Sequence, residues 1–209
     1  MKICEIFKSI QGEGLLIGLP CVFVRTSGCN LDCAWCDTRY ARSEGKEMTV
    51  IEVLDQVRNY DIQLVCITGG EPLLQPETYC LVDTLLDEGY SVQLETNGSV
   101  PLERVSCHEN LMISMDFKTP SSGMQERMIM ENLEILSPYD QLKLVVADRE
   151  DMSFVEEFLA VNDIPCPVVV TPVGGTDIKP VAEWVLERNL NVRVLPQLHK
   201  LIWGEERGH

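Results

Sequence analysis

The chain is organised around one stretch, Gly28-Cys29-Asn30-Leu31-Asp32-Cys33-Ala34-Trp35-Cys36-Asp37-Thr38. Its three cysteines have the spacing C-x3-C-x2-C, and Trp35 stands directly before the last of them. Thiolates this close together in one loop can hold three irons of a four-iron cubane and leave the fourth iron without a protein ligand. The stretch therefore predicts a [4Fe-4S] cluster held by Cys29, Cys33 and Cys36.

Two other uses of these cysteines fit less well. A closed structural zinc site needs four ligands, usually as two closely spaced pairs. The nearest further cysteines, Cys4, Cys21 and Cys66, lie in apolar runs, and no histidine lies within a few residues of the loop. A disulfide within the loop would leave one cysteine of the three unpaired. The cluster remains the best interpretation.

The cysteine pattern resembles the signature of the radical S-adenosylmethionine (radical SAM) enzymes. The resemblance implies that SAM chelates the open iron through its methionine amino and carboxylate groups. It also implies that an electron from the reduced cluster cleaves SAM to a 5′-deoxyadenosyl radical.

Length and composition limit the possible architectures. At 209 residues, the chain is expected to form a single radical SAM domain over residues 1–209, with the polar residues 204–209 as a frayed tail. A complete (β/α)8 barrel typically needs about 250 residues, so a barrel here would be shortened.

The charge and the cysteine content bear on partners and location. A formal net charge of −16 argues against a nucleic-acid partner, because phosphate binding needs a clustered basic surface. No apolar run approaches the roughly 20 residues of a membrane span, and the N-terminus lacks a signal-peptide pattern. Nine cysteines without a secretory signal predict a reducing, cytoplasmic location.

Apolar runs alternate with segments of helical periodicity along the chain. Strands are expected at 3–7, 20–26, 63–68, 91–96, 111–116, 141–147, 168–171 and 192–195. Helices are expected at 49–57, 77–87, 126–136, 152–161 and 181–187, the first with a capping box of Thr49 and Glu52. Such alternation gives a parallel sheet, and polar segments follow its strands where barrels place active sites. The sequence therefore predicts an α/β fold, a partial (incomplete) TIM-type (β/α) barrel of the radical SAM class.

Several strand ends are candidates for SAM binding. Gly70 and Glu71 follow a buried strand and resemble the radical SAM motif whose backbone meets the methionine end of SAM, although the same residues suit an ordinary strand-to-helix turn. Glu95 ends the next strand and could accept bonds from the ribose hydroxyls, or be a solvated strand end.

Two later segments complete this expected site. Ser114, Asp116 and Lys118 alternate as they leave a strand, so they share one face, although this could be chance. Thr171-Pro172-Val173-Gly174 follows another strand and could pack beside the adenine or form a bare turn. His199 could also face the cleft.

A narrower resemblance covers nearly the whole chain. It rests on the segments Glu5-Ile6-Phe7-Lys8-Ser9-Ile10-Gln11-Gly12-Glu13-Gly14, Arg25, Cys36-Asp37-Thr38, Thr68-Gly69-Gly70-Glu71-Pro72, Glu95-Thr96-Asn97-Gly98 and Gln197-Leu198-His199-Lys200. Together they resemble the 7-carboxy-7-deazaguanine synthase family. The resemblance implies a lyase that contracts 6-carboxy-5,6,7,8-tetrahydropterin to 7-carboxy-7-deazaguanine with loss of ammonia, for 7-deazapurines such as queuosine or archaeosine. SAM would be regenerated and act as a cofactor.

The family also implies roles for single residues. Ile10, Gln11, Gly12 and Glu13 would contact the pterin, Arg25 would clamp its carboxylate, and Thr68 would lie on the substrate side of the SAM motif. The Mg2+ that the family uses would take a hydroxyl ligand from Thr38. We expect no catalytic residue beyond the cluster and SAM, because the motifs contain no evident acid and base pair.

The resemblance further implies a homodimer and an electron donor such as flavodoxin or ferredoxin. Two departures from the family are visible. The cysteine loop is compact where some members carry an insertion, and the chain continues to His209 where the C-terminal end of some members touches substrate. The main alternatives are an activating enzyme acting on a partner protein and a non-catalytic iron–sulfur protein, which would normally need a fourth protein ligand.

Overall fold

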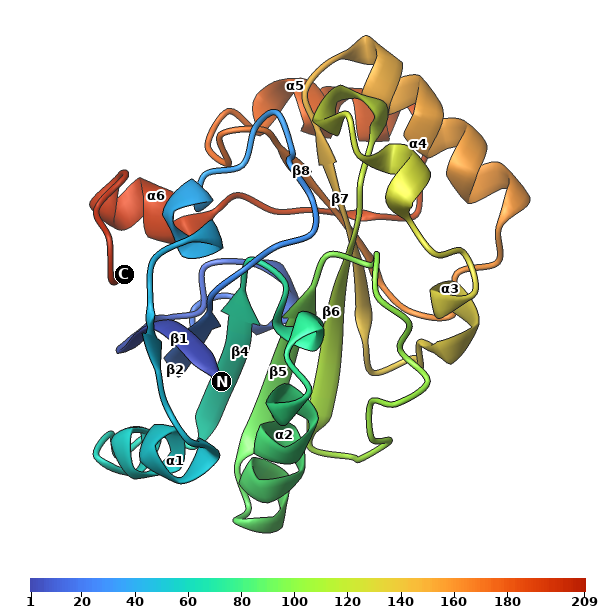
Figure 1. Cartoon of the computed structure of the whole chain (residues 1–209). Coiled ribbons are helices and arrows are strands. Elements are labelled where there is room, and N and C mark those ends of the chain that lie inside the picture. The colour runs from blue at the N-terminus through green and yellow to red at the C-terminus, as the bar shows by residue number, and fades with distance from the viewer.

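Nine strands form one sheet in the computed structural model, which describes residues 1–209 (Figure 1). The sheet order is β3-β1-β2-β4-β5-β6-β7-β8-β9. The strands are β1 (Lys2–Ile10), β2 (Pro20–Thr26), β3 (Lys46–Glu47), β4 (Leu64–Gly69), β5 (Ser91–Thr96), β6 (Leu111–Phe117), β7 (Gln141–Val146), β8 (Val168–Pro172) and β9 (Arg193–Val194). β1 is antiparallel to β2 and β3, and the strands from β2 to β9 are parallel.

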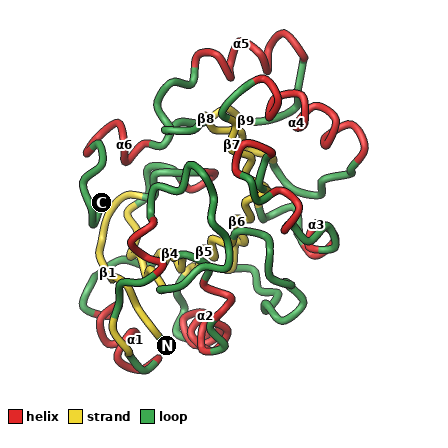
Figure 2. Tube along the Cα trace, turned by 45° about the horizontal axis from the view of Figure 1, so that its top comes forward, coloured by secondary structure: helices red, strands yellow, loops and turns green.

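The helices are α1 (Val50–Arg58), α2 (Glu77–Asp87), α3 (Asn132–Ile135), α4 (Arg149–Val161), α5 (Lys179–Arg188) and α6 (Leu198–Trp203). The sheet curves into an open arc, with α1 to α5 on its outer side and α6 at the opening between its two ends (Figure 2). β3 and β9 end the arc and do not pair with each other, so the barrel is not closed. The predicted partial barrel is confirmed. No helix has the length and apolar character that crossing a bilayer demands.

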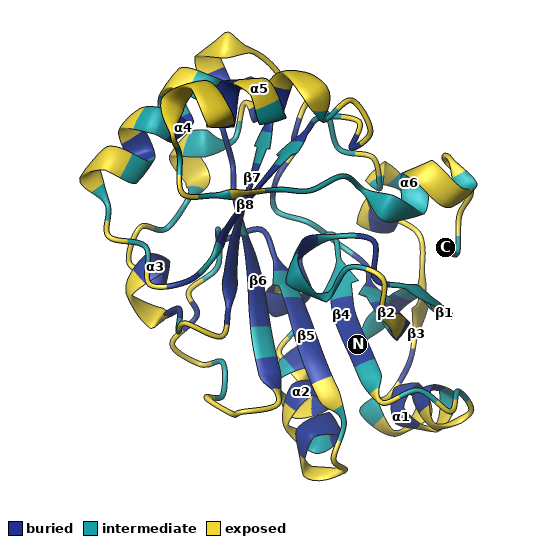
Figure 3. Ribbon diagram, turned by 180° about the vertical axis from the view of Figure 1, so that it is seen from behind, coloured by how far each residue is buried: buried dark blue, intermediate teal, exposed yellow.

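Local sequence explains why the main elements form. Thr49 and Glu52 make the predicted capping box at the start of α1, and Val53, Leu54 and Val57 form the face that α1 buries. The central strands are buried on both faces because helices cover one side and loops the other (Figure 3). Their side chains contribute to a core of 34 buried residues.

One predicted helix does not form as expected. The segment 126–136 contains only the four-residue α3 and a short 3-10 turn before it. Asn132, which is buried, donates to the carbonyls of Gly98 and Val100 and accepts from the amide of Leu102. Because these bonds tie the segment to a neighbouring loop, tertiary contacts override its helical periodicity.

The segment after β9 bridges the two ends of the arc. The amide of Gln197 donates to Gly175 O at 2.7 Å, beyond β8, and the amide of Leu198 donates to Gly12 O at 2.8 Å, beyond β1. Sequence analysis did not predict the helix that follows, α6. The tail beyond it folds back, since Arg207 lies 3.5 Å from the ring centre of Tyr40 and pairs with Glu44 at 2.7 Å.

Candidate active site

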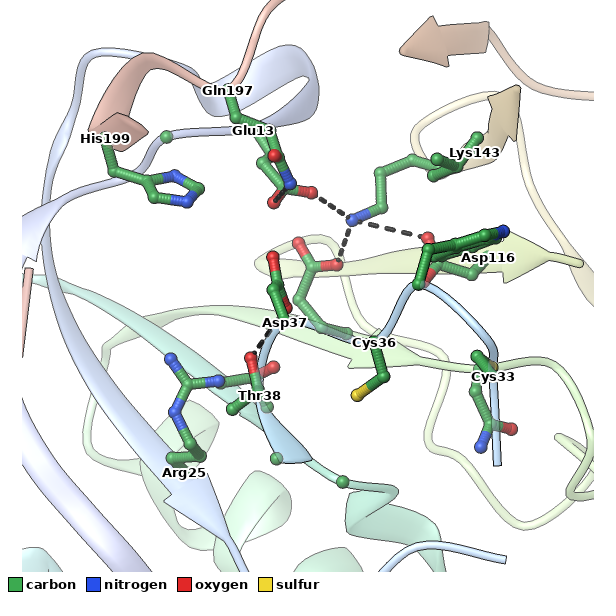
Figure 4. A pocket seen from close by; sticks show the side chains of 18 of the residues that line it. Glu13, Arg25, Cys33, Cys36, Asp37, Thr38, Asp116, Lys143, Gln197 and His199 are labelled. Atoms are coloured by element: carbon green, nitrogen blue, oxygen red, sulfur yellow. Dashed lines mark hydrogen bonds and ion pairs between the residues drawn. The ribbon is translucent and has the colours of Figure 1, made fainter. Parts of the chain in front are cut away.

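A cleft of about 250 Å3 opens at the carboxyl ends of the parallel strands. It is lined by residues from both ends of the arc, from the cysteine loop and from the segment after β9 (Figure 4). Most residues expected from the sequence line it: Cys29, Cys33, Cys36, Thr38, Gly70, Glu95, Asp116, Lys118, Pro172, Val173, Gly174, Ile10, Gln11, Gly12, Glu13, Arg25 and Thr68. The structure therefore brings the predicted cluster, SAM and substrate residues into one cavity.

Three residues expected to contact SAM do not line this cleft. Glu71 is fully buried and accepts from the amides of Leu73 and Asn97. Ser114 is also fully buried, and its hydroxyl donates to Glu95 at 2.9 Å. Thr171 donates to the carbonyl of Leu195. These side chains support the walls of the cleft.

The cysteine loop is anchored at several points. The amide of Gly28 donates to Ala41 O at 2.8 Å, the amide of Ala34 donates to Ser122 O at 3.0 Å, and the Trp35 indole donates to Ser121 Oγ at 3.0 Å. All nine cysteines are free thiols, which excludes the disulfide interpretation for this structure. The side chains of the loop are therefore available as ligands.

The cysteine geometry suits a cubane better than a single ion. No three His, Cys, Asp or Glu side chains converge closely enough to hold one metal ion. In a cubane each cysteine binds a different iron, so its three sulfurs do not need to converge on one point. Burial raises the pKa of the Cys33 thiol, and nearby Lys118 opposes this effect. A cation at this position favours the thiolate that iron requires.

Gly70 allows the SAM motif to pack against the cysteine loop. A Cβ on Gly70 would lie 2.1 Å from Gly28 O and 2.7 Å from Cys29 Cβ. The amide of Glu71 donates to the same Gly28 carbonyl at 2.8 Å. Only glycine permits this approach of two backbones, so the two motifs form one surface.

Lys143, on β7, lies at the centre of the charged side chains in the cleft (Figure 4). Its Nζ lies 2.8 Å from Glu13 Oε2, 2.8 Å from Glu95 Oε2 and 3.4 Å from Asp116 Oδ1. Lys118 pairs separately with Asp116 at 2.7 Å. Two ammonium groups thus neutralise part of the charge of three carboxylates.

These contacts shift the pKa values of the group. Burial alone would raise the pKa of Asp116, but Lys118 and Lys143 lower it to about 2. Burial likewise works against ionisation of Glu13, yet Lys143 leaves the pKa of Glu13 below its ordinary value. Burial is the main cause that raises the pKa of Glu95, and the neighbouring carboxylates of Glu13 and Asp116 raise it further, although Lys143 opposes them. Lys143 therefore favours the ionised form of Glu13, and Lys118 together with Lys143 favours that of Asp116.

The loop after β1 is held by bonds that run to distant elements. Glu13 accepts from Gln197 Nε2 at 2.7 Å, and Gln11 Nε2 donates to Gln93 Oε1 at 2.6 Å. The amide of Leu15 donates to Gln141 Oε1 at 2.7 Å. Among the buried acceptors of the cleft, Gln197 Oε1 has no hydrogen-bond donor, and Asp116 Oδ1 has only the ion pair with Lys143 at 3.4 Å. Such atoms suit a polar ligand.

Arg25 faces the cleft from β2. Its Nε donates to Glu5 Oε1 at 2.7 Å, and Tyr40 donates its hydroxyl to the same oxygen at 2.8 Å. The guanidinium also lies 5.9 Å from the ring centre of Phe7. These contacts fix the stem of Arg25, so its terminal nitrogens can bind an anion.

The hydroxyl of Thr38 donates to Asp37 Oδ1 at 2.8 Å, and Lys200 lies 3.1 Å from Asp37 Oδ2. Although burial opposes ionisation, Lys200 lowers the pKa of Asp37. Hydroxyl and carboxylate oxygens are hard ligands of the kind that Mg2+ prefers. The pair therefore fits a magnesium ion completed by water or substrate oxygens.

His199 lies in the cleft beside Gly12, and burial lowers its pKa, which favours the neutral imidazole. Lys143 and Asn97 also line the cleft, although the sequence motifs assign no role to either of them. Asn97 follows the predicted Glu95-Thr96 strand end, so its position was available from the sequence. Lys143 had no comparable signal.

Comparison with known proteins defines the family. The Radical SAM superfamily model matches residues 23–135. The 7-carboxy-7-deazaguanine synthase of Thermoplasma acidophilum is 41% identical over 208 residues, covering 100% of both chains. The chain belongs to the 7-carboxy-7-deazaguanine synthase family. The synthase of Methanospirillum hungatei is also 41% identical, over 97% of this chain and 85% of that one.

Solved structures agree with this assignment to the synthase family. The crystal structure of QueE from Escherichia coli superposes with a TM-score of 0.74 at 26% identity, covering 93% of each chain. Streptococcus suis SuiB bound to S-adenosylmethionine has a TM-score of 0.55 at 14% identity, over 83% of this chain and 45% of that one, and shows the shared fold alone. Similarity to the deazaguanine synthases extends over the whole chain, which favours this family over an activating enzyme and over a non-catalytic iron–sulfur protein.

Proposed function

We propose that the cleft binds SAM and 6-carboxy-5,6,7,8-tetrahydropterin together and contracts the pterin ring. The enzyme is a radical SAM lyase that forms 7-carboxy-7-deazaguanine with loss of ammonia, in 7-deazapurine biosynthesis of the queuosine or archaeosine type. The observation that carries this conclusion is the 41% identity to a synthase of this name over the full chain. The shared lining of one cleft by the cysteine loop, the SAM motif and the loop after β1 supports it.

The cofactors are a [4Fe-4S] cluster, SAM and Mg2+. When reduced and bound to SAM, the cluster supplies the radical chemistry that begins the reaction. We assign three irons to Cys29, Cys33 and Cys36, which line the cleft as free thiols. The main chain at Gly70 would receive the methionine end of SAM, because the glycine leaves the backbone open.

The remaining SAM contacts would come from the strand ends. Glu95 would bind the ribose of SAM, and Asp116 and Lys118 would make further polar contacts with SAM. The adenine would lie beside Pro172, Val173 and Gly174. All six residues line the cleft. Glu71, Ser114 and Thr171 would act as supports, because their side chains are engaged with other protein groups.

The pterin would lie between β1, β2 and the segment after β9. Ile10, Gln11 and Gly12 would border the ring. Glu13 would accept from the donors of the aminopyrimidine end, because Lys143 favours its ionised form. Arg25 would bind the substrate carboxylate through a charge-assisted and bidentate contact. Thr68 lines the floor of the same cleft.

We assign Mg2+ to the hydroxyl of Thr38, with Asp37 beside it as a charge partner. The distance of 2.8 Å between Thr38 Oγ1 and Asp37 Oδ1 supports this choice. Mg2+ commonly keeps several waters and takes only one or two protein ligands. Substrate oxygens would complete the shell, since Thr38 lines the same cleft as the proposed substrate residues.

Four further features belong to the proposal. Residues 1–209 form a single domain, supported by the one continuous sheet and the common core. The chain acts in the cytoplasm, supported by nine cysteines without a disulfide. It forms a homodimer and accepts electrons from a flavodoxin or ferredoxin, both as the family implies.

The test of this function uses the purified chain with a reconstituted cluster, SAM, dithionite and Mg2+, incubated anaerobically with 6-carboxytetrahydropterin. Mass spectrometry should detect 7-carboxy-7-deazaguanine without any added partner protein. If SAM is consumed while the pterin is untouched, the substrate assignment fails, and a partner-protein substrate becomes the better proposal.

A further inference from the structure

Five residues form a closed ring of polar contacts, and four of them, Gln11, Glu13, Glu95 and Lys143, line the cleft. Gln93 Nε2 donates to Glu95 Oε1 at 2.7 Å, and Gln11 Nε2 donates to Gln93 Oε1 at 2.6 Å. The amide of Glu13 then donates to Gln11 Oε1 at 3.1 Å. Lys143 closes the ring, because its Nζ lies 2.8 Å from both Glu13 Oε2 and Glu95 Oε2.

The ring has one defined hydrogen-bond direction. Glu95 accepts from the Gln93 amide nitrogen, so the Gln93 oxygen must face the Gln11 nitrogen. The Gln11 oxygen must then accept from the amide of Glu13. Reversing either glutamine would place two donors or two acceptors against each other. In the observed arrangement, every donor of the ring therefore faces an acceptor.

Glu95 is the junction of the ring. Its Oε2 accepts from Lys143 and from the Ser114 hydroxyl, while its Oε1 accepts from Gln93. A carboxylate offers about four acceptor sites, so one site on Oε1 remains for a ligand hydroxyl. Contacts on the pterin side thus end on the same carboxylate that would bind SAM.

Gln93 connects the two sides of the site without lining the cleft itself. It is fully buried on β5 and does not line the cleft, so it cannot touch either ligand. Its side chain nevertheless joins Gln11, on the pterin side, to Glu95, on the SAM side. A buried glutamine whose two ends are each held by a functional residue transmits the position of one to the other.

We propose that Gln93 and Lys143 are positioning residues that hold the pterin loop and the SAM carboxylate as one unit, so that binding of either ligand strengthens binding of the other. This inference rests on the proposed function, which assigns the two ligands. A ligand hydroxyl on Glu95 fixes that carboxylate, and the ring fixes Gln11 and Glu13 in turn. The second ligand then meets a site whose side chains are already ordered.

The test measures binding without turnover. The cluster-reconstituted protein is kept oxidised and anaerobic, and 6-carboxypterin serves as the pterin probe because it lacks the hydrogen at C-6. Isothermal titration gives its Kd with and without saturating SAM, and the Kd of SAM with and without the probe. The two ratios must agree, because coupling between binding sites is reciprocal.

In the wild-type protein, saturation with either ligand should lower the Kd of the other at least about fivefold. Gln93→Met keeps the length of the side chain but removes both bonds, and it should reduce the ratio below about twofold. Lys143→Met breaks the link between Glu13 and Glu95 and should also reduce the ratio below about twofold. The second variant keeps the test available if one of the two does not fold. Thr78→Val removes a buried bond on α2, from Thr78 Oγ1 to Pro72 O at 2.7 Å, and should keep the wild-type ratio.

The outcomes that would refute the positioning role differ from those that would refute the proposed substrate. If both ligands bind and the ratio in Gln93→Met and Lys143→Met equals that of wild type, the positioning role is wrong while the function stands. A wild-type ratio of one would also overturn it. If wild-type protein binds SAM but no pterin probe, the proposed substrate itself is wrong.

Discussion

Replacing Glu71 by Gln tests how the SAM motif is held against the strand beside it. Glu71 is fully buried, and Oε1 accepts from the Leu73 amide at 3.1 Å and the Thr96 hydroxyl at 3.0 Å. Oε2 accepts from the Asn97 amide at 2.7 Å. In Glu71→Gln one oxygen becomes an NH2 group that faces a donor. Leaving a buried donor without its acceptor costs about 1–3 kcal/mol of unfolding free energy.

The cost should depend on pH in a defined direction. Burial raises the pKa of Glu71 from 4.5 to about 7, against the effect of its three donors. The stability that the protonated group contributes is therefore fully present below pH 4.5 and is lost as pH rises through about 7. Between about pH 5.5 and 8.5 the wild-type protein should lose about 2 kcal/mol from this group. Gln does not titrate, so the cost of Glu71→Gln should shrink as pH rises.

Urea unfolding of both proteins at several pH values, anaerobically and with the cluster in place, measures this difference. Thr78→Val is the matched control, because it removes a buried hydrogen bond without removing a titrating group, and its cost should not change with pH. If the cost of Glu71→Gln stays constant between about pH 5.5 and 8.5, the carboxyl is ionised throughout this range. The three donors would then outweigh burial, and the reasoning would be refuted.

Three other substitutions test the assigned sites. Arg25→Lys loses the bidentate geometry for the substrate carboxylate and should raise KM for the pterin about 10- to 100-fold in steady-state kinetics, and an unchanged KM would exclude the clamp. Thr38→Ala should abolish stimulation by Mg2+ while the visible absorbance of the cluster is unchanged; persistent stimulation would remove Thr38 from the site. Gly70→Ala places its Cβ 2.1 Å from the backbone oxygen of Gly28 and should lower the iron content after reconstitution. In Gly12→Ala the nearest atoms to the new Cβ all belong to the side chain of His199, with Nδ1 at 2.2 Å, so the iron content should match wild type. Equal iron in both variants would contradict the backbone argument.

Features encoded in short stretches could be predicted from the sequence. The capping box of Thr49 and Glu52 fixes the start of α1, and the strand of residues 91–96 and the helix of residues 77–87 have the expected bounds. The cysteine loop needs only its own spacing to indicate a cluster. Each of these features depends on residues close together in the sequence, so it can be predicted without knowledge of the tertiary structure.

The rest depends on contacts between distant residues. Lys143 lies in an apolar strand, and its importance arises because register places it beside Glu95 and Glu13, which is 130 residues away in the chain. Asn132 similarly prevents a helix by bonding to the loop at 98–102. Gln93 has no motif of its own. Periodicity cannot reveal such roles, because the partners are determined by the fold.

The most direct test of the account follows the hydrogen at C-6 of the pterin. The reconstituted enzyme would be incubated anaerobically with C-6-deuterated 6-carboxytetrahydropterin, SAM, Mg2+ and dithionite, and both the product and the recovered SAM would be analysed by mass spectrometry. We expect 7-carboxy-7-deazaguanine, no stoichiometric loss of SAM, and deuterium in the recovered SAM. Product formation with SAM that is consumed or free of deuterium would contradict the claim that one cleft passes this hydrogen from the pterin to SAM and back.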